Sequence, residues 1–318
     1  MALQRRLSSL LGSRFPYSAS AVVGPRTFSA SAEESSSSEQ QQQQRVTTTL
    51  QSNGIAHVQL NRPNKLNALD MAMFEAIAET AERLASDKSV RAVILSGQGR
   101  GFSAGLDVKS VANPKNNNPL ASIRTLLSKR HDNSVSNLAQ DVGYLWRSVP
   151  APVIAAIHGV CFGGGLQIAL GADMRFCTPD AKLSIMEAKW GLIPDMSASV
   201  TLRELLPIDV AKELTFTGRI LSGEQAAQYN LVTRCVDDPL QEAEQVALEI
   251  VEKSPDAVAC AKKLYHKNWV HQSEADALHY EMELQKTLLG SWNQLAASVD
   301  NFGVSVPYMS RKNDDGKK

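Results

Sequence analysis

The chain has 318 residues, of which 43% are hydrophobic, and these values suit one large globular domain or two small ones. Its 33 basic and 33 acidic residues balance, so the composition gives no support for a nucleic-acid-binding protein. The four cysteines, Cys161, Cys177, Cys235 and Cys260, form no CxxC pair, and the six histidines form no ligand-spaced cluster. These spacings argue against a disulfide framework or a metal site.

The N-terminus is typical of an organelle transit peptide. Residues 1–32 contain Arg5, Arg6, Arg14 and Arg26, many serines and no acidic residue. The early amphipathic arginines favour the mitochondrial matrix over a plastid, and the C-terminal "NDDGKK" is not a peroxisomal SKL signal. Residues 33–45, "EESSSSEQQQQQR", are polar and of low complexity, which predicts a disordered linker before a folded part that starts at residue 46.

The first half of the folded part alternates between strand and helix patterns. Two β-rich runs flank Asn53-Gly54, a strong hairpin signal. Apolar spacing predicts a helix over residues 71–86 with Asp70 as its N-cap. "VRAVILSG" predicts a buried strand before a glycine-rich loop, and residues 113–134 form a polar insertion that we expect to be mobile.

The most apolar run, residues 152–172, approaches the length of a membrane span. It contains His158, Gln167 and a glycine cluster, so it predicts a buried strand, a turn and a buried helix, with no membrane span. Short strand patterns follow, the last over residues 231–236, and helices are expected from about residue 240. The alternation predicts a layered α/β fold.

Two glycine loops, "GFSAGLD" and "CFGGGLQ", each follow an apolar strand and precede a helix. Such strand-to-helix turns aim free backbone N–H groups at one point. Two of them side by side could hold one oxygen atom between two amides, which is an oxyanion hole. Neither loop matches the common phosphate-binding motifs GxxxxGK[ST] or GxGxxG followed by an acidic residue.

Four motifs, "NRPNKLNALD", "GRGFSAGLDV", "HGVCFGGGLQIALGAD" and "AKLSIMEAKWGLIPD", resemble in order and spacing those of the crotonase (enoyl-CoA hydratase/isomerase) superfamily. The resemblance implies an α/β fold with a spiral ββα core over residues 46–239. It also implies a helical C-terminal region over residues 240–311, used to assemble a homotrimer or a dimer of trimers, before a polar tail, residues 312–318. The implied substrate is an acyl-CoA thioester, with no cofactor beyond the CoA that belongs to the substrate, and no metal.

The resemblance also assigns roles within the two loops. The oxyanion donors would be the N–H groups of Leu106 and Gly164, in agreement with the two amide-bearing turns. The residues expected to bind CoA or the acyl group are Ser103 and Ala104, both near the adenine, together with Gly105, Leu106, Asp107, Gly163 and Gly164.

Acidic residues around the hole sort the reactions of this superfamily. Hydratases that the chain resembles use two glutamates; one matches Glu187, and the other position holds Gln167. A neutral amide cannot accept or return a proton, although it can hydrogen-bond a water. Because general acid–base catalysis normally contributes about 100- to 10,000-fold, we do not expect an efficient standard hydratase.

A third candidate, Asp195, lies eight residues after Glu187. Dienoyl-CoA isomerases, which the chain resembles here, share this spacing but carry an aspartate where Gln167 stands. The same spacing with a preceding proline resembles 3-hydroxyisobutyryl-CoA hydrolases, which lack an acid at the glutamine position and are longer at the C-terminus. A purely structural alternative makes Asp195 the N-cap of the following helix.

The leading hypothesis is double-bond isomerisation of an enoyl- or dienoyl-CoA through an oxyanion-stabilised enolate. Glu187 would move the proton, Asp195 would be a second proton station, and Gln167 would orient water or substrate. The alternatives are an enoyl-CoA hydratase, a 3-hydroxyacyl-CoA hydrolase and a non-catalytic acyl-CoA-binding scaffold. His158 is interpreted as a hydrogen-bonded turn residue, and Trp190 as part of the core or of a pocket wall.

Overall fold

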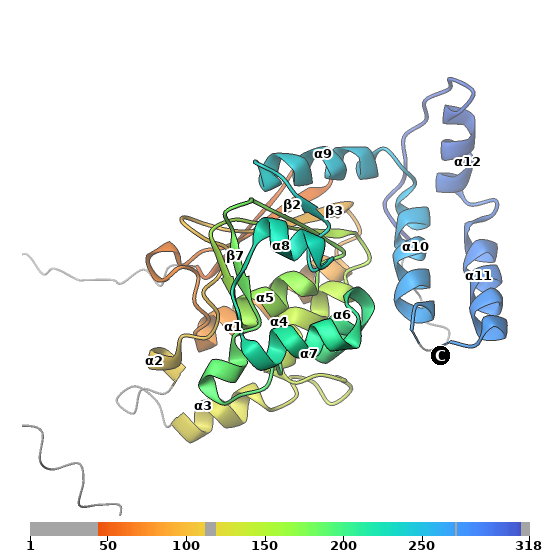
Figure 1. The fold of residues 1–318 in the computed structure, drawn as a ribbon. Helices are drawn as coiled ribbons and strands as arrows, with labels where there is room; N and C mark the ends of the chain where they lie inside the picture. Colours follow the sequence, from red (N-terminus) through yellow and green to blue (C-terminus); the bar gives the residue numbers. More distant parts are fainter. Residues whose placement is uncertain (1–43, 112–118, 271, 313–318) are drawn as a thin grey trace, which may run out of the picture. The chain divides into compact units, whose positions relative to one another are not determined.

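The structure, a computed structural model, describes residues 44–111, 119–270 and 272–312 (Figure 1). The predicted transit peptide lies outside the described residues, as do residues 33–43 of the predicted linker and 313–318 of the predicted tail. What is described is an α/β fold with two sheets, as the alternating sequence pattern predicts.

The larger sheet has six strands in the order β1-β2-β3-β4-β6-β9. β1 and β2 form the predicted antiparallel hairpin around Asn53 and Gly54, where Gly54 adopts a φ of 88°. The other neighbours in this sheet are parallel. Its strands are β1 (Val46–Leu50), β2 (Ile55–Leu60), β3 (Ala92–Gly97), β4 (Val153–Ile157), β6 (Met174–Cys177) and β9 (Arg234–Cys235).

A second, three-stranded sheet contains β5 (Val160–Phe162), β7 (Lys182–Ser184) and β8 (Leu221–Ser222). The chain passes from β4 to β5 and then into helix α5 (Gly164–Leu170). One turn later it passes from β6 to β7 and then into the 3₁₀ helix η3 (Glu187–Trp190). Each turn thus gives one strand to each sheet before a helix, which confirms the predicted ββα spiral.

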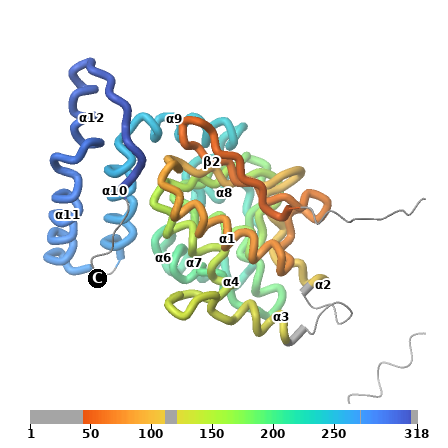
Figure 2. Tube along the Cα trace, turned by 180° about the vertical axis from the view of Figure 1, so that it is seen from behind, coloured from red at the N-terminus to blue at the C-terminus, as the bar shows by residue number. Residues whose placement is uncertain are grey.

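Helices cover both faces of the larger sheet (Figures 1 and 2). Alternate residues of β3 face opposite sides, so Val93 and Leu95 join a core with α1 (Met71–Ser86), α4 (Leu138–Tyr144) and α5. Ile94 instead packs toward α9 (Pro239–Val251). The remaining helices are η1 (Pro63–Lys65), α2 (Val108–Val111), α3 (Pro119–Leu126), η2 (Leu145–Arg147), α6 (Ala198–Leu205), α7 (Ile208–Thr217), α8 (Gly223–Gln228), α10 (Pro255–Asn268), α11 (Glu274–Leu288) and α12 (Trp292–Asp300).

Several predictions about single elements and residues can be compared directly with the structure. The helix predicted over residues 71–86 is α1, and Asp70 caps it by accepting a hydrogen bond from Met73 N. The insertion that was expected to be mobile contains the helix α3. Trp190 is 62% exposed and so is not a core residue. His158 Nε2 donates to Gly99 O at 2.8 Å, as expected of a turn histidine.

The last three helices, α10 to α12, lie beside the sheets and do not cover them (Figure 2). A buried lysine on α10, Lys262, ties them to the core: its Nζ lies 2.6 Å from Asp173 Oδ2 and donates to the carbonyls of Trp146 and Ala151. The C-terminal segment returns to the core, where Arg311 donates to Val90 O at 3.2 Å. Lys262 and Arg311 thus attach the C-terminal part of the chain to the spiral through polar contacts.

Replacement of Asp173 by alanine is expected to destabilise the fold. The change leaves the Lys262 ammonium, 6% exposed, without its carboxylate, and breaking a buried ion pair from one side costs about 3–5 kcal/mol. Urea unfolding followed by circular dichroism measures the effect. Glu283→Gln is the control because its pair with Lys286 is exposed on both sides. Equal unfolding midpoints for the two variants would contradict the expectation.

Candidate active site

The two glycine loops meet through a short backbone pairing between Ser103 and β5. Ser103 N donates to Val160 O, and Phe162 N donates to Ser103 O, both at 3.0 Å. This isolated parallel bridge, Ser103 with Cys161, brings the loop after β3 against the strand that leads into α5. Residues about 60 positions apart are thereby fixed beside each other.

Both predicted oxyanion donors are available in this arrangement. Within the described part of the chain, neither Leu106 N–H nor Gly164 N–H donates to a protein acceptor. Gly164 is the first residue of α5, where backbone N–H groups have no partner within the helix. A Cβ atom on Gly105 would lie 3.4 Å from Gly164 N, so the two turns are close neighbours. The geometry supports the predicted pair of donors.

Each residue of the triple glycine has its own reason to lack a side chain. Gly163 has a φ of 51°, and a Cβ there would lie 3.3 Å from Glu187 Oε1. A Cβ on Gly164 would lie 2.6 Å from Met196 Sδ, and one on Gly165 would lie 2.7 Å from Ser103 O. The run of glycines therefore lets the Glu187 carboxylate, the Met196 thioether and the Ser103 loop approach the same turn.

The other residues of the first loop that were predicted to bind CoA or the acyl group differ in burial and in hydrogen-bond partners. Ser103 has no exposed surface, and its hydroxyl donates to Asn67 O at 2.8 Å, so its side chain shapes the turn and is not an exposed lining of a CoA channel. Ala104 and Leu106 are half-buried. Asp107 is paired with Arg62 at 2.7 Å; burial raises the pKa of its carboxyl, but the Arg62 hydrogen bond and charge outweigh this, and the pKa is lowered.

Gln167 and Glu187 occupy the two positions that hold glutamates in the hydratases the chain resembles, and their side chains are in direct contact. Gln167 Nε2 donates to Glu187 Oε1 at 2.6 Å. Gln167 Oε1 accepts hydrogen bonds from Met196 N at 2.8 Å and from Ala198 N at 3.3 Å. Gln167 is only 1% exposed. Its oxygen is therefore fully used by the protein and does not orient a water.

Glu187 stands at the start of η3 and is the buried carboxylate of the site. It is 8% exposed, and its second oxygen, Oε2, is buried without a hydrogen-bond partner among the described residues. Burial raises the pKa of the carboxyl, hydrogen bonding to nearby backbone and to Gln167 lowers it, and the charge of Asp195 raises it; the net change is upward. An unpartnered oxygen of a carboxylate with a raised pKa is suited to accept a proton from a bound molecule.

Asp195 lies on the exposed side of the same region. Its charge acts on Glu187, so the two acids are electrostatic neighbours, and partial desolvation raises the pKa of Asp195 itself. It does not cap a helix, because α6 begins after Ser197 with no side-chain cap. The N-cap alternative is therefore wrong.

Two residues that shape the candidate site, Asn67 and Met196, were not predicted from the sequence. Asn67 is fully buried, adopts a φ of 53°, and donates to Gln98 O and Gly101 O, which joins the "NRPNKLNALD" loop to the glycine-rich loop. Met196 packs on Gly164 through its side chain and holds Gln167 through its backbone. Asn is among the residues that tolerate left-handed backbone, and this was the available signal for Asn67.

In residues 44–111, 119–270 and 272–312, no group of three or more His, Cys, Asp or Glu side chains is arranged to hold a metal ion. None of the helices in those ranges combines the length and apolar character that a membrane crossing needs.

Comparisons with known proteins agree with this geometry. The family model described as enoyl-CoA hydratase/isomerase matches residues 50–302. The mitochondrial Delta(3,5)-Delta(2,4)-dienoyl-CoA isomerase of Homo sapiens is 32% identical over 262 residues, 79% of this chain and 75% of that protein. Carnitinyl-CoA dehydratase of Salmonella typhi is 33% identical over 220 residues, 68% of this chain and 78% of that protein.

Solved structures show the same fold. The crystal structure of enoyl-CoA hydratase from Mycobacterium smegmatis superposes with a TM-score of 0.71 at 27% identity and covers 83% of this chain and 98% of that one. The two-sheet ββα architecture and these structural matches define a crotonase-fold protein. The chain belongs to the enoyl-CoA hydratase/isomerase family.

A methyl group at Gly105 is expected to disrupt the oxyanion turn. Gly105 has a φ of 81°, and a Cβ there would lie 2.6 Å from Phe162 O, so Gly105→Ala must displace the segment that carries Leu106 N–H. Loss of one donor typically lowers kcat about 100- to 1,000-fold. The measurement is turnover of enoyl- and dienoyl-CoA thioesters.

Gly303→Ala is the matched control, because Gly303 has a similar φ of 79° with nothing within 4 Å of the added atom. It should carry the same kind of backbone strain and keep its activity. Equal kcat values for the two variants would show that the position of the Leu106 turn does not matter.

Proposed function

We propose that the protein moves a carbon–carbon double bond in an enoyl- or dienoyl-CoA thioester. The observation that carries this proposal is the pair Gln167–Glu187: one buried carboxylate oxygen is unpartnered beside the Gly164 turn, and the position next to it holds an amide. The similarity to dienoyl-CoA isomerases supports the same reaction class.

The proposed reaction begins with the thioester oxygen between the N–H groups of Leu106 and Gly164. Glu187 Oε2 takes a proton from the carbon chain; the C–H bond breaks, and its electron pair passes into an enolate whose oxygen the two amides stabilise. The carboxylic acid then returns the proton at the distal carbon as the enolate collapses and the double bond takes its new place. In a conjugated dienoyl substrate, Asp195 would be the second proton station.

The environment of Gln167 argues against efficient hydration. A hydratase of this family needs a second acid–base group to deliver water, and the amide at residue 167 cannot transfer a proton. The oxygen of Gln167 already accepts two backbone N–H groups, so it has no role in holding an attacking water. Glu187 therefore remains as the buried acid–base group of the site.

The decisive test offers the purified protein 3-enoyl-CoA, 3,5-dienoyl-CoA and 2-enoyl-CoA. We expect isomerised product from the first or second substrate, and Glu187→Gln should lower kcat about 100- to 10,000-fold because it removes the base. Glu213→Gln is the control, since Glu213 lies in an exposed ion pair on α7. Hydration of 2-enoyl-CoA alone, abolished by Glu187→Gln, would restore the hydratase reading.

Other outcomes would favour the remaining alternatives. Thiol release from a 3-hydroxyacyl-CoA would identify a hydrolase, and binding of CoA esters without turnover of any substrate would identify a non-catalytic scaffold.

If the protein is an isomerase, turnover in D₂O distinguishes proton transfer by Glu187 from proton transfer by Asp195. A proton held on the buried Glu187 should be partly retained in the product, whereas a proton delivered by the exposed Asp195 should be replaced by deuterium.

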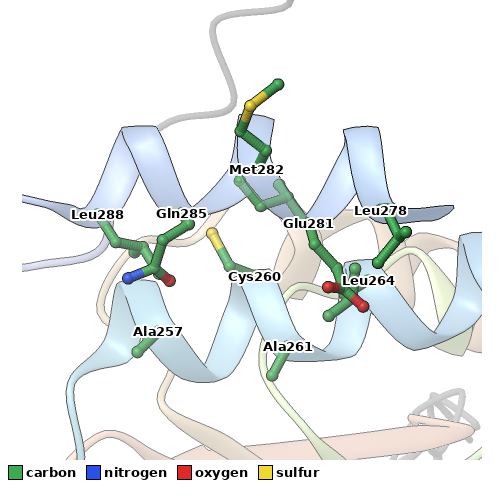
Figure 3. Close-up of a pocket in the computed structure, with 10 residues that line it drawn as sticks. Ala257, Cys260, Ala261, Leu264, Leu278, Glu281, Met282, Gln285 and Leu288 are labelled. Carbon is green, nitrogen blue, oxygen red and sulfur yellow. The ribbon is translucent and has the colours of Figure 1, made fainter. Parts of the chain in front are cut away.

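We also propose that the C-terminal helices mediate self-assembly. α11 buries none of its side chains in the single chain, and Leu278 and Met282 on it are 64% and 45% exposed. A groove of about 630 Å³ opens between α10 and α11, lined by side chains that include Cys260, Leu264 and Gln285 (Figure 3). A homotrimer, or a dimer of trimers, would cover this apolar surface.

Sedimentation velocity tests this assembly. The double variant Leu278→Asp, Met282→Asp should sediment as smaller species than the unmodified protein, because two charges would be placed in an apolar interface. Val135→Asp, at a 78% exposed position away from these helices, is the control. A monomeric unmodified protein would contradict the proposal.

The proposed location is the mitochondrial matrix. The arginine-rich, acid-poor residues 1–32 support it, and the dienoyl-CoA isomerase to which the chain is similar carries a mitochondrial name.

A further inference from the structure

We propose that Gln167 is a positioning residue that holds one oxygen of Glu187, leaves the other free to react, and joins Glu187 to the turn that follows Asp195. The inference rests on the proposed function only in taking Glu187 as the base. It assigns Gln167 a role through Glu187 and through the backbone, with no direct contact to water or substrate.

The orientation of the Gln167 amide follows from its partners. Oε1 faces two backbone donors, Met196 N and Ala198 N, so Nε2 must face Glu187. The opposite orientation would set an NH₂ group against two N–H groups and a carbonyl oxygen against a carboxylate. The arrangement tolerates one amide orientation, and that orientation always directs a donor at Glu187 Oε1.

The two backbone donors belong to a strained turn. Ser197 between them has a φ of 76°, and it is 7% exposed. Alternate N–H groups on either side of a left-handed residue converge on one acceptor, as in an anion-binding nest, and here the acceptor is Gln167 Oε1. Because Asp195 directly precedes this turn, the same amide fixes the segment that carries the second acid.

The backbone of Gln167 is held within helix α5. It lies in the first turn of α5, three residues after Gly164, and its own N–H donates to Gly163 O at 3.0 Å. A single side chain thus connects the oxyanion turn, Glu187 and the Asp195 segment. Asp195 is the charged neighbour whose field reaches Glu187, whereas Lys189 of η3 is exposed and lies beside Gly218.

The contact has an electrostatic consequence that can be measured. A donor to a carboxylate favours its charged form, so the Gln167 hydrogen bond lowers the pKa of Glu187 against the upward effect of burial. A glutamate at residue 167 would instead set a second negative charge beside Glu187 Oε1, where Nε2 now lies 2.6 Å away. Two carboxylates this close titrate as a pair, with one pKa strongly raised.

The test titrates Glu187 directly in the full chain by NMR of ¹³C-labelled glutamate carboxyls, with Glu187→Gln used to assign the resonance. Gln167→Met removes the donor with little change of volume, so the pKa of Glu187 should rise. Gln167→Glu should give two coupled titrations. In both variants the acidic limb of the kcat/KM profile should move to higher pH. For Gln167→Met, kcat should fall about 10- to 100-fold with little change in KM.

Gln228→Met, at an exposed position on α8, is the control and should leave the Glu187 titration unchanged. An unchanged Glu187 pKa in Gln167→Met would overturn the proposal. Should that variant fail to fold, the near-isosteric Gln167→Glu decides, and a Glu187 titration equal to that of the unmodified protein would overturn it. The titration needs no substrate. Absence of isomerase turnover would therefore defeat the proposed function while leaving this inference to stand or fall on the pKa.

Discussion

Two backbone hydrogen bonds, from Ser103 N to Val160 O and from Phe162 N to Ser103 O, hold the two glycine loops of the candidate site together. They fix the loop after β3 against the strand before α5, so both turns present an N–H group at one location. Such a pairing leaves almost no room between the backbones, and Gly165 lies where a Cβ would meet Ser103 O at 2.7 Å. Gly165 is required by this approach, whereas a Cβ on Gly163 would lie close to Glu187 and a Cβ on Gly164 close to Met196.

Glu187 and Asp195 differ in their exposure to solvent. Glu187 is buried and its Oε2 has no hydrogen-bond partner in the described part of the chain, so its charge is costly and a proton on it is shielded from water. Asp195 is exposed, and its proton exchanges with solvent. The side-chain amide of Gln167, on α5, connects Glu187 to the 196–198 turn next to Asp195, and this amide carries no charge. A neutral linker adds no third carboxylate beside Glu187 and Asp195.

The sequence predicted those features that depend on local requirements. A strand followed by glycines and a helix predicts a turn with free amides, and Leu106 and Gly164 are placed accordingly. The role of Gln167 could not be predicted, because its acceptor oxygen is satisfied by N–H groups 29 and 31 residues later in the chain. Asp195 was open to an N-cap reading because Asp before a helical run is a common start signal, whereas the left-handed Ser197 precedes the helix. The complete burial of Ser103 likewise depends on tertiary pairing.

Arg311, which lies next to the last described residue, connects the C-terminal segment to the core. It donates to Asp87 O, at the C-cap of α1, and to Val90 O, just before β3; the contact with Val90 spans 221 residues of sequence. Carbonyls at the end of a helix need partners, and here a side chain more than two hundred positions away supplies the donor. Contacts of such long range form late in folding, because the entropy of closing the intervening loop must be overcome first. Synthesis from the N-terminus therefore delivers every residue of the spiral before Arg311, whose side chain connects the C-terminal segment to it.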